Sequence, residues 1–231
     1  MGNITTLLLQ DVRFQEALSA CMNCGVCTAI CPAAEFYNYD PRKICDIVQR
    51  EEDAEIEKLL RSETIWYCGE CMSCATRCPR GNTPGLVIIA LRQIAQQLGY
   101  FVNSEKGRQQ LIIKNVIGGS ILQRGYCVHP DIVVPETHPE QGPIWKWFCD
   151  NIKDVAPKLG ANYQGTGTGA LRQVSEQDLD EIAAIFEATG ALDFYQNIDK
   201  FSDEKRGKTS KPDYLNEIYT TNDNTHSCKV T

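Results

Sequence analysis

The sequence predicts a mainly α-helical protein, on three observations. Asp40 before Pro41 and Thr83 before Pro84 read as helix starts, because an N-cap side chain accepts backbone hydrogen bonds and proline suits the first turn. Apolar residues then recur at helical spacing. Between these two starts no convincing strand pattern occurs.

The expected helices follow in chain order. The first runs from Leu8 to Leu18, and two short ones separated by an acidic break carry Ile44, Ile47 and Val48, then Ile56, Leu59 and Leu60. The clearest helix starts at Pro84, places Val87, Leu91, Ile94, Ala95 and Leu98 on one face, and ends at Gly99.

The remaining chain is less regular. Residues 104–117 have helical character, and residues 125–145 contain four prolines and are expected to be extended. Ser175 with Asp178 resembles a capping box ahead of a helix that reaches Thr189 and ends at Gly190. Residues 202–231 are polar and charged, so we expect them to be disordered or laid over a partner.

Composition narrows the functional classes. The 231 residues are 42% hydrophobic and 23% charged, as in a globular protein, and the net charge of −7 with no basic tract argues against nucleic acid. The longest apolar run, Leu86–Leu91, is too short for a membrane span. No signal peptide pattern opens the chain, so we expect a cytoplasmic protein.

Eight of the 12 cysteines form an internal repeat. The stretches CMNCGVCTAICP (21–32) and CGECMSCATRCP (68–79) superpose with a constant offset, and each is followed by a helix. Cysteines at C-x2-C spacing inside a cell are more often metal ligands or redox groups than disulfides. The repeat therefore indicates two metal sites.

The C-x2-C-x2-C-x3-C-P spacing is typical of [4Fe–4S] clusters, and in two-cluster ferredoxins the cysteine before the proline ligates the other cluster. Applied here, the first cluster takes Cys21, Cys24, Cys27 and Cys78, and the second takes Cys68, Cys71, Cys74 and Cys31. Two zinc ions would also use eight thiolates, but zinc sites need neither the third closely spaced cysteine nor the proline.

The stretch from about residue 14 to 98 resembles HdrC, the C-type iron–sulfur component of heterodisulfide reductase. The resemblance rests on both cysteine motifs, on YDPRKI (39–44), on IWYCGECMSCATRCPRG (65–81) and on the helix after Pro84. It implies an α-helical ferredoxin domain over residues 1–105, with two [4Fe–4S] clusters. Residues 106–231 would then form a C-terminal extension of helix and loop that binds a partner.

The resemblance also implies the role of an electron-transfer subunit in a hetero-oligomer. In that family electrons pass between a flavin-bearing HdrA subunit and a catalytic HdrB subunit with CCG modules. This chain has no adjacent cysteine pair, and GTGTGA (165–170) reads as a flexible linker and not as a dinucleotide fingerprint. Any substrate chemistry is thus expected on an HdrA-like or HdrB-like partner. A similar subunit occurs in heterodisulfide reductase-like complexes of some sulfur oxidisers, which would place the chain in sulfur metabolism.

Two alternatives stay open. One is the iron–sulfur subunit of another oxidoreductase, of the fumarate reductase or glycolate oxidase type; these usually add a [2Fe–2S] domain or CCG modules, which are not present here. The other is a non-redox binding module with structural metal sites.

Several residues outside the motifs are weighed separately. Arg77 and Arg80 lie beside a ligand and would either raise a cluster potential or belong to a solvated surface. We interpret Cys45 as a small buried hydrophobe, and the aromatic stretch Ile144–Phe148 as an interface anchor or local core. No metal role is expected for Cys127, Cys149, Cys228, His129 or His138.

Overall fold

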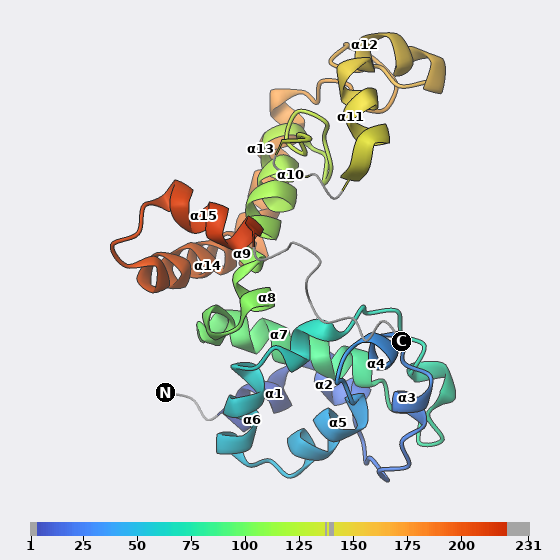
Figure 1. The fold of residues 1–231 in the computed structure, drawn as a ribbon, viewed down its shortest axis with the longest axis vertical. Helices are drawn as coiled ribbons and strands as arrows, with labels where there is room; N and C mark the ends of the chain where they lie inside the picture. Colours follow the sequence, from blue (N-terminus) through green and yellow to red (C-terminus); the bar gives the residue numbers. More distant parts are fainter. Residues whose placement is uncertain (1–3, 137, 139–140, 221–231) are drawn as a thin grey trace. The chain divides into compact units, whose positions relative to one another are not determined.

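The computed structural model describes residues 4–136, 138 and 141–220 (Figure 1). Contacts group the chain into two compact units, Met1–Gln110 with Asn197–Thr231, and Leu111–Gln196. Within the described residues there is no strand, only an isolated parallel bridge between Ala161 and Ala170, so the mainly helical prediction is confirmed. The division expected near residue 105 remains a prediction.

The first unit begins with two helices in place of the single one expected over residues 8–18. These are α1 (Ile4–Gln10) and α2 (Val12–Ala17). The break falls at Asp11, whose side chain accepts a 2.9 Å hydrogen bond from the Arg13 backbone N–H and so caps a new helix. The apolar spacing continues across Asp11, so the sequence pattern predicted one helix where the structure has two.

The cysteine region is built from short helices. They are α3 (Val26–Ala29), α4 (Pro32–Phe36), α5 (Pro41–Gln49), α6 (Asp53–Leu60), and the 3₁₀ turns η1 (Thr64–Tyr67) and η2 (Ala75–Arg77). Asp40 caps α5 as predicted, because its carboxylate accepts from the backbone N–H groups of Arg42 and Lys43. The expected break between two short helices is confirmed at residues 50–52.

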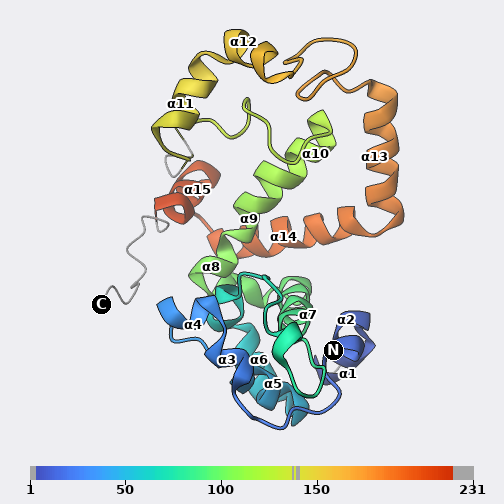
Figure 2. The ribbon, with the colours of Figure 1, turned by 90° about the vertical axis from the view of Figure 1, so that its right-hand side faces the viewer.

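The central helix of this unit is α7 (Pro84–Gln97), which packs against α1, α2, α5 and α6 (Figures 1 and 2). Its buried face carries Val87, Ile88, Ala90, Leu91, Ile94 and Ala95, all at most 2% exposed. The helix ends as predicted, with Gly99 in the left-handed region at φ +77°. Thr83 precedes it without capping it, and its backbone N–H donates to the Ala17 carbonyl at 2.8 Å.

The first unit also contains η3 (Tyr100–Asn103), α8 (Glu105–Arg108) and α15 (Lys211–Thr220). The C-terminal part of α14 (Ala191–Arg206) belongs to it as well. Ile198, Tyr214 and Ile218 are buried. The expectation of disorder from residue 202 is therefore wrong for the described part, which is helical over 202–206 and 211–220 and buries apolar side chains of its own. That this segment lies over a partner stays a prediction.

The second unit holds the rest of the helices. They are α9 (Gln110–Ile113), a π-helical turn η4 (Lys114–Gly118), α10 (Gly119–Arg124), α11 (Gly142–Asp150), α12 (Ile152–Val155), η6 (Pro157–Leu159) and α13 (Glu176–Ala188). Ser175 caps α13 by accepting from the Asp178 N–H at 3.1 Å, as predicted. Residues 125–136 form the expected irregular segment, but the expectation is wrong for residues 142–145, which open α11 with Pro143 in its first turn. Among the helices that the structure describes, none has the length and apolar content of a membrane span.

Candidate metal centre

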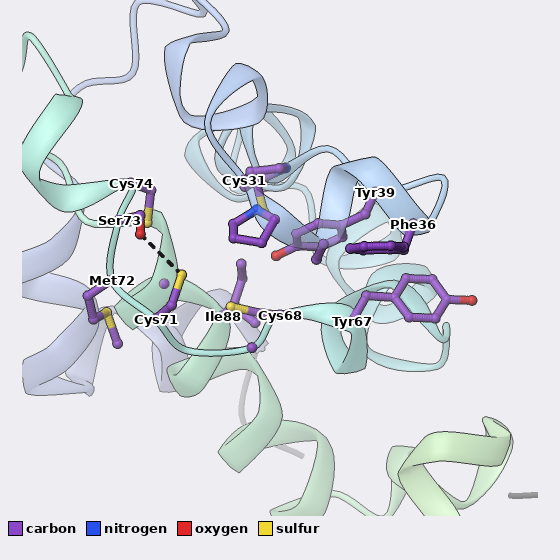
Figure 3. Close-up of a pocket in the computed structure, with 15 residues that line it drawn as sticks. Cys31, Phe36, Tyr39, Tyr67, Cys68, Cys71, Met72, Ser73, Cys74 and Ile88 are labelled. Carbon is purple, nitrogen blue, oxygen red and sulfur yellow. Dashed lines mark hydrogen bonds between the residues drawn. The ribbon is translucent and has the colours of Figure 1, made fainter. Parts of the chain in front are cut away.

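The eight motif cysteines line two cavities in the first unit. The larger cavity, of about 240 Å³, is lined by Cys31, Cys68, Cys71 and Cys74 (Figure 3). The smaller cavity, of about 20 Å³, is lined by Cys21, Cys24, Cys27 and Cys78. Each cavity thus combines three cysteines of one motif with the last cysteine of the other. All eight are free thiols.

The two motifs share one loop conformation. Asn23 and Glu70, each two residues after a first cysteine, have positive φ values of 59° and 55°. Their backbone N–H groups point to the sulfurs of Cys21 and Cys68, both at 3.4 Å. Positive φ also recurs two residues later in each motif. The two motifs therefore repeat in backbone conformation as well as in sequence.

An arginine from a following helix holds each left-handed residue. Arg42 on α5 donates from Nη1 to Asn23 Oδ1 at 2.8 Å, and Arg92 on α7 donates to the carboxylate of Glu70. Arg92 also reaches the backbone carbonyls of Ile65 at 2.7 Å and Cys68 at 2.6 Å. A strained non-glycine conformation persists where its surroundings hold it, and these contacts supply that hold.

The last cysteine of each motif reaches the other motif because α3 and η2 pack against each other. Cys31 follows α3 and is the N-cap residue of α4, whose first helical residue is Pro32. Cys78 follows η2 in the same way. The prolines thus lie where the chain turns away after the exchanged cysteine.

The wall of the larger cavity is apolar and aromatic. It includes Phe36, Tyr39, Tyr67, Met72 and Ile88, and no charged side chain is among its lining residues. Sequence reasoning did not single these residues out. For Tyr39 the sequence did hold one signal, its position directly before Asp40. Asp40 is the N-cap of α5, so the start of that helix fixes the direction of the Tyr39 side chain.

The smaller cavity has a different lining. Arg42 and Arg80 contribute positive charge to it, and Cys45, which is 1% exposed, lines it together with the motif cysteines. Burial raises the pKa of the Cys45 thiol, in keeping with its interpretation as a small buried hydrophobe. Arg77, in contrast, is exposed and does not line this cavity.

The thiols show why such a site needs a cation. Burial raises the pKa of Cys27 to about 11 and also raises the pKa of Cys74, whereas a hydrogen bond with the Ser73 hydroxyl lowers the pKa of Cys71. A buried thiolate requires a compensating positive charge, which bound metal supplies. Four thiols around one cavity provide the donor set of a [4Fe–4S] cluster, one per iron. Among the described residues, no three Cys, His, Asp or Glu side chains converge as a single metal ion would require.

The remaining candidates take no part in either cavity. Cys127, Cys149, His129 and His138 belong to the second unit and are not among the lining residues, while Cys228 lies outside the described residues. The GTGTGA loop is not simply a flexible linker, because Asn162 Nδ2 donates to the carbonyls of Thr166 at 3.1 Å and Thr168 at 3.2 Å.

The aromatic stretch at 144–148 was interpreted as either an interface anchor or local core, and different residues of it fit each interpretation. Trp145 packs locally, since it donates from Nε1 to the Val133 carbonyl at 2.7 Å and stacks on Phe148. Ile144 and Trp147 are 81% and 57% exposed on α11. The exposed pair is the part that an interface would use.

Comparison with known proteins agrees with the cysteine geometry. Residues 17–82 match the family model of the 4Fe–4S dicluster domain. The chain is similar to HdrC of the ferredoxin:CoB-CoM heterodisulfide reductase of Methanosarcina acetivorans, with 32% identity over 78% of this chain and 66% of the relative. It is also similar to the iron–sulfur HdrC protein of the CoB–CoM heterodisulfide reductase of Methanopyrus kandleri, with 29% identity over 54% of this chain and 66% of the relative.

A third relative matches a shorter stretch, of 84 residues. This is the second iron–sulfur HdrC protein of the CoB–CoM heterodisulfide reductase of Methanocaldococcus jannaschii, with 37% identity over 36% of this chain and 43% of the relative. The chain thus covers less than two thirds of the length of each of these relatives.

Proposed function

Because the chain belongs to the HdrC family of heterodisulfide reductase, we propose that it is the electron-transfer iron–sulfur subunit of a heterodisulfide reductase-like complex. In this proposal it passes electrons between a flavin-containing HdrA-like subunit and an HdrB-like subunit with CCG modules. A [4Fe–4S] cluster accepts and releases single electrons, and two of them in one chain would form a path.

The observation that carries this proposal is the three-plus-one make-up of both cavities. Cys21, Cys24, Cys27 and Cys78 would hold the first cluster, and Cys68, Cys71, Cys74 and Cys31 the second. This arrangement supports ligation crossed between the motifs, as in two-cluster ferredoxins.

The residues around the cysteines would set the reduction potentials of the two clusters and would not take part in substrate chemistry. The N–H groups of Asn23 and Glu70 approach ligand sulfurs, and Arg42 and Arg92 fix the loops that present them. Hydrogen bonds to ligand sulfur and nearby positive charge both favour the reduced, more negative state. The reducing cytoplasm is the proposed compartment, since eight ligand cysteines must remain thiols there.

The partner surface is proposed on α11. Ile144 and Trp147 are large, apolar and exposed, and aromatic residues of this kind are enriched at interface hot spots. A hetero-oligomer would cover them.

Two measurements test the proposal. Protein prepared without oxygen should contain about eight iron and eight acid-labile sulfide per chain, as two full clusters require. Zinc without sulfide would overturn it and leave the structural-metal alternative. Affinity capture of the tagged chain from its host should then recover a flavin-binding subunit and a CCG-containing subunit. Recovery of a different flavoenzyme would assign the chain to another oxidoreductase.

A further inference from the structure

The hydroxyl of Tyr39 is a buried polar group that the fold does not explain. Tyr39 is 4% exposed and lines the larger cavity. Its oxygen lies near the Cys68 sulfur but has no hydrogen-bond partner of standard donor–acceptor geometry among the described residues. Buried hydroxyls in native proteins are almost always paired, so an unpaired one that faces a cavity indicates a missing acceptor.

The direction of the ring is set by its neighbours. Tyr39 packs edge-on against Tyr67, with ring centroids 6.3 Å apart, and Tyr67 stacks in turn on Tyr37 at 4.4 Å. The next residue, Asp40, is fixed as the N-cap of α5. Figure 3 shows the Tyr39 oxygen pointing toward the side of the cavity where Cys31 and Cys68 lie, whereas the Tyr67 oxygen points away from the cysteines.

The Tyr39 hydroxyl can act as a hydrogen-bond donor. A tyrosine hydroxyl ordinarily loses its proton only near about pH 10, so at neutral pH it carries a proton to donate. Ser73 also lines the cavity with a hydroxyl group. That hydroxyl already accepts a hydrogen bond from the Cys71 thiol, whereas the Tyr39 hydroxyl has no such bond.

We infer that Tyr39 donates a hydrogen bond to a sulfur of the [4Fe–4S] group in the larger cavity, on the side of Cys31 and Cys68, and that this bond raises the reduction potential of that group. The inference rests on the proposed function, because it needs a cluster in that cavity. Reduction adds one electron and one negative charge; Tyr39 keeps its proton, and its O–H dipole stabilises the added charge. The apolar wall strengthens the effect, since few other dipoles or waters compete there.

The test compares two single-hydroxyl deletions in the full-length chain, Tyr39→Phe and Tyr67→Phe. Both are purified without oxygen and titrated by electron paramagnetic resonance against solution potential. We expect Tyr39→Phe to lower the midpoint of one cluster and leave the other unchanged. Tyr67→Phe should match the wild type, because its hydroxyl faces away from the cysteines.

Each other outcome is also decisive. Unchanged midpoints in Tyr39→Phe with full iron and sulfide would overturn the inference and leave the proposed function intact. A folded Tyr39→Phe chain that loses one cluster would support a contact between the hydroxyl and that cluster. An unfolded Tyr39→Phe variant would overturn it, because the hydroxyl would then be needed for folding and not only for the cluster. A wild-type chain without iron and sulfide would overturn the proposed function itself.

Discussion

The Nη2 atom of Arg92 donates a 2.6 Å hydrogen bond to the backbone carbonyl of Cys68. Its Nε donates to the Ile65 carbonyl at 2.7 Å, and the side chain is only 16% exposed. The central helix α7 is thus tied directly to the loop of the second motif. Three predictions concern this cysteine region, and two concern the stability of the chain.

Replacement of Arg92 by glutamine should destabilise the protein by about 2–4 kcal/mol. A hydrogen bond from a charged donor contributes about 1.5–3 kcal/mol, and two carbonyls would lose theirs. Urea unfolding under anaerobic conditions measures the change. Arg50→Gln is the matched control, because Arg50 is 61% exposed in a surface pair with Asp46 and should change stability by less than about 1 kcal/mol. Equal effects of the two variants would contradict a structural role of the Arg92 contacts.

Crossed ligation predicts a specific pattern in double variants. Cys31→Ser combined with Cys68→Ser should lose no more iron than either alone, because both residues would serve one cluster. Cys31→Ser combined with Cys21→Ser should lose both clusters. Iron and sulfide analysis with electron paramagnetic resonance distinguishes these cases. The reverse pattern would mean that each motif supplies all four ligands of its own cluster.

Cys45 should prove dispensable for metal binding. Cys45→Ala removes a buried sulfur beside the smaller cavity and should reduce stability by about 1–2 kcal/mol through the space it leaves. Iron and sulfide per chain should stay at the wild-type value. A drop by half in both would instead identify Cys45 as a ligand.

Gly99 should resist substitution for two separable reasons. Its φ of +77° disfavours any side chain, and a Cβ there would approach the Phe201 ring to 2.5 Å. Gly207 has a φ of +58° but open space around the corresponding position. We therefore expect Gly207→Ala to cost about 1 kcal/mol from backbone strain alone, and Gly99→Ala to cost about 1–3 kcal/mol more from the clash. Thermal unfolding of both variants measures the difference.

Acid should weaken the second unit through His129 and Asp131. Burial lowers the pKa of His129, which is 3% exposed. Burial alone would raise the pKa of Asp131, but hydrogen bonds from Tyr163 and Gln164 hold it below its usual value. In both cases the unfolded chain binds more protons than the folded one, so stability falls as pH falls. The loss begins below about pH 6.5 with His129 and continues below about pH 4 with Asp131.

Thermal unfolding between pH 7 and 5 checks the histidine part. Tryptophan fluorescence in a Trp66→Phe background reports on the second unit through Trp145 and Trp147. His129→Gln should flatten the pH dependence, whereas Asp150→Asn, at an exposed position, should leave it unchanged. An unaltered slope in His129→Gln would rule out this contribution.

Local signals in the sequence were sufficient for much of the first unit. The Asp40–Pro41 start, the break between α5 and α6, and the end of α7 at Gly99 all depend on neighbouring residues, and the structure has each of them. The break at Asp11 was missed because apolar spacing runs through it, although an N-cap side chain lies there.

Features that depend on distant contacts were harder to foresee. Polar composition suggested a disordered or partner-bound segment after residue 202, yet α15 forms there and Tyr214 and Ile218 are buried. In the sequence Tyr39 stood out only as part of the YDPRKI stretch that carries the family resemblance. Its place in a cavity was not predictable, because residues spread from 31 to 88 form that cavity. Spacing alone suggested the cysteine sets, but only folding shows which side chains enclose them.

The exchange of Cys31 and Cys78 has a consequence for biosynthesis. Each cavity draws its cysteines from both motifs, and each also needs the start of α7, through Pro84 in one case and Gly85 and Ile88 in the other. A nascent chain that has emerged only to residue 60 therefore presents four of the eight motif cysteines and neither complete cavity. If the two cavities bind the clusters, we expect cluster insertion only after the start of α7 has left the ribosome.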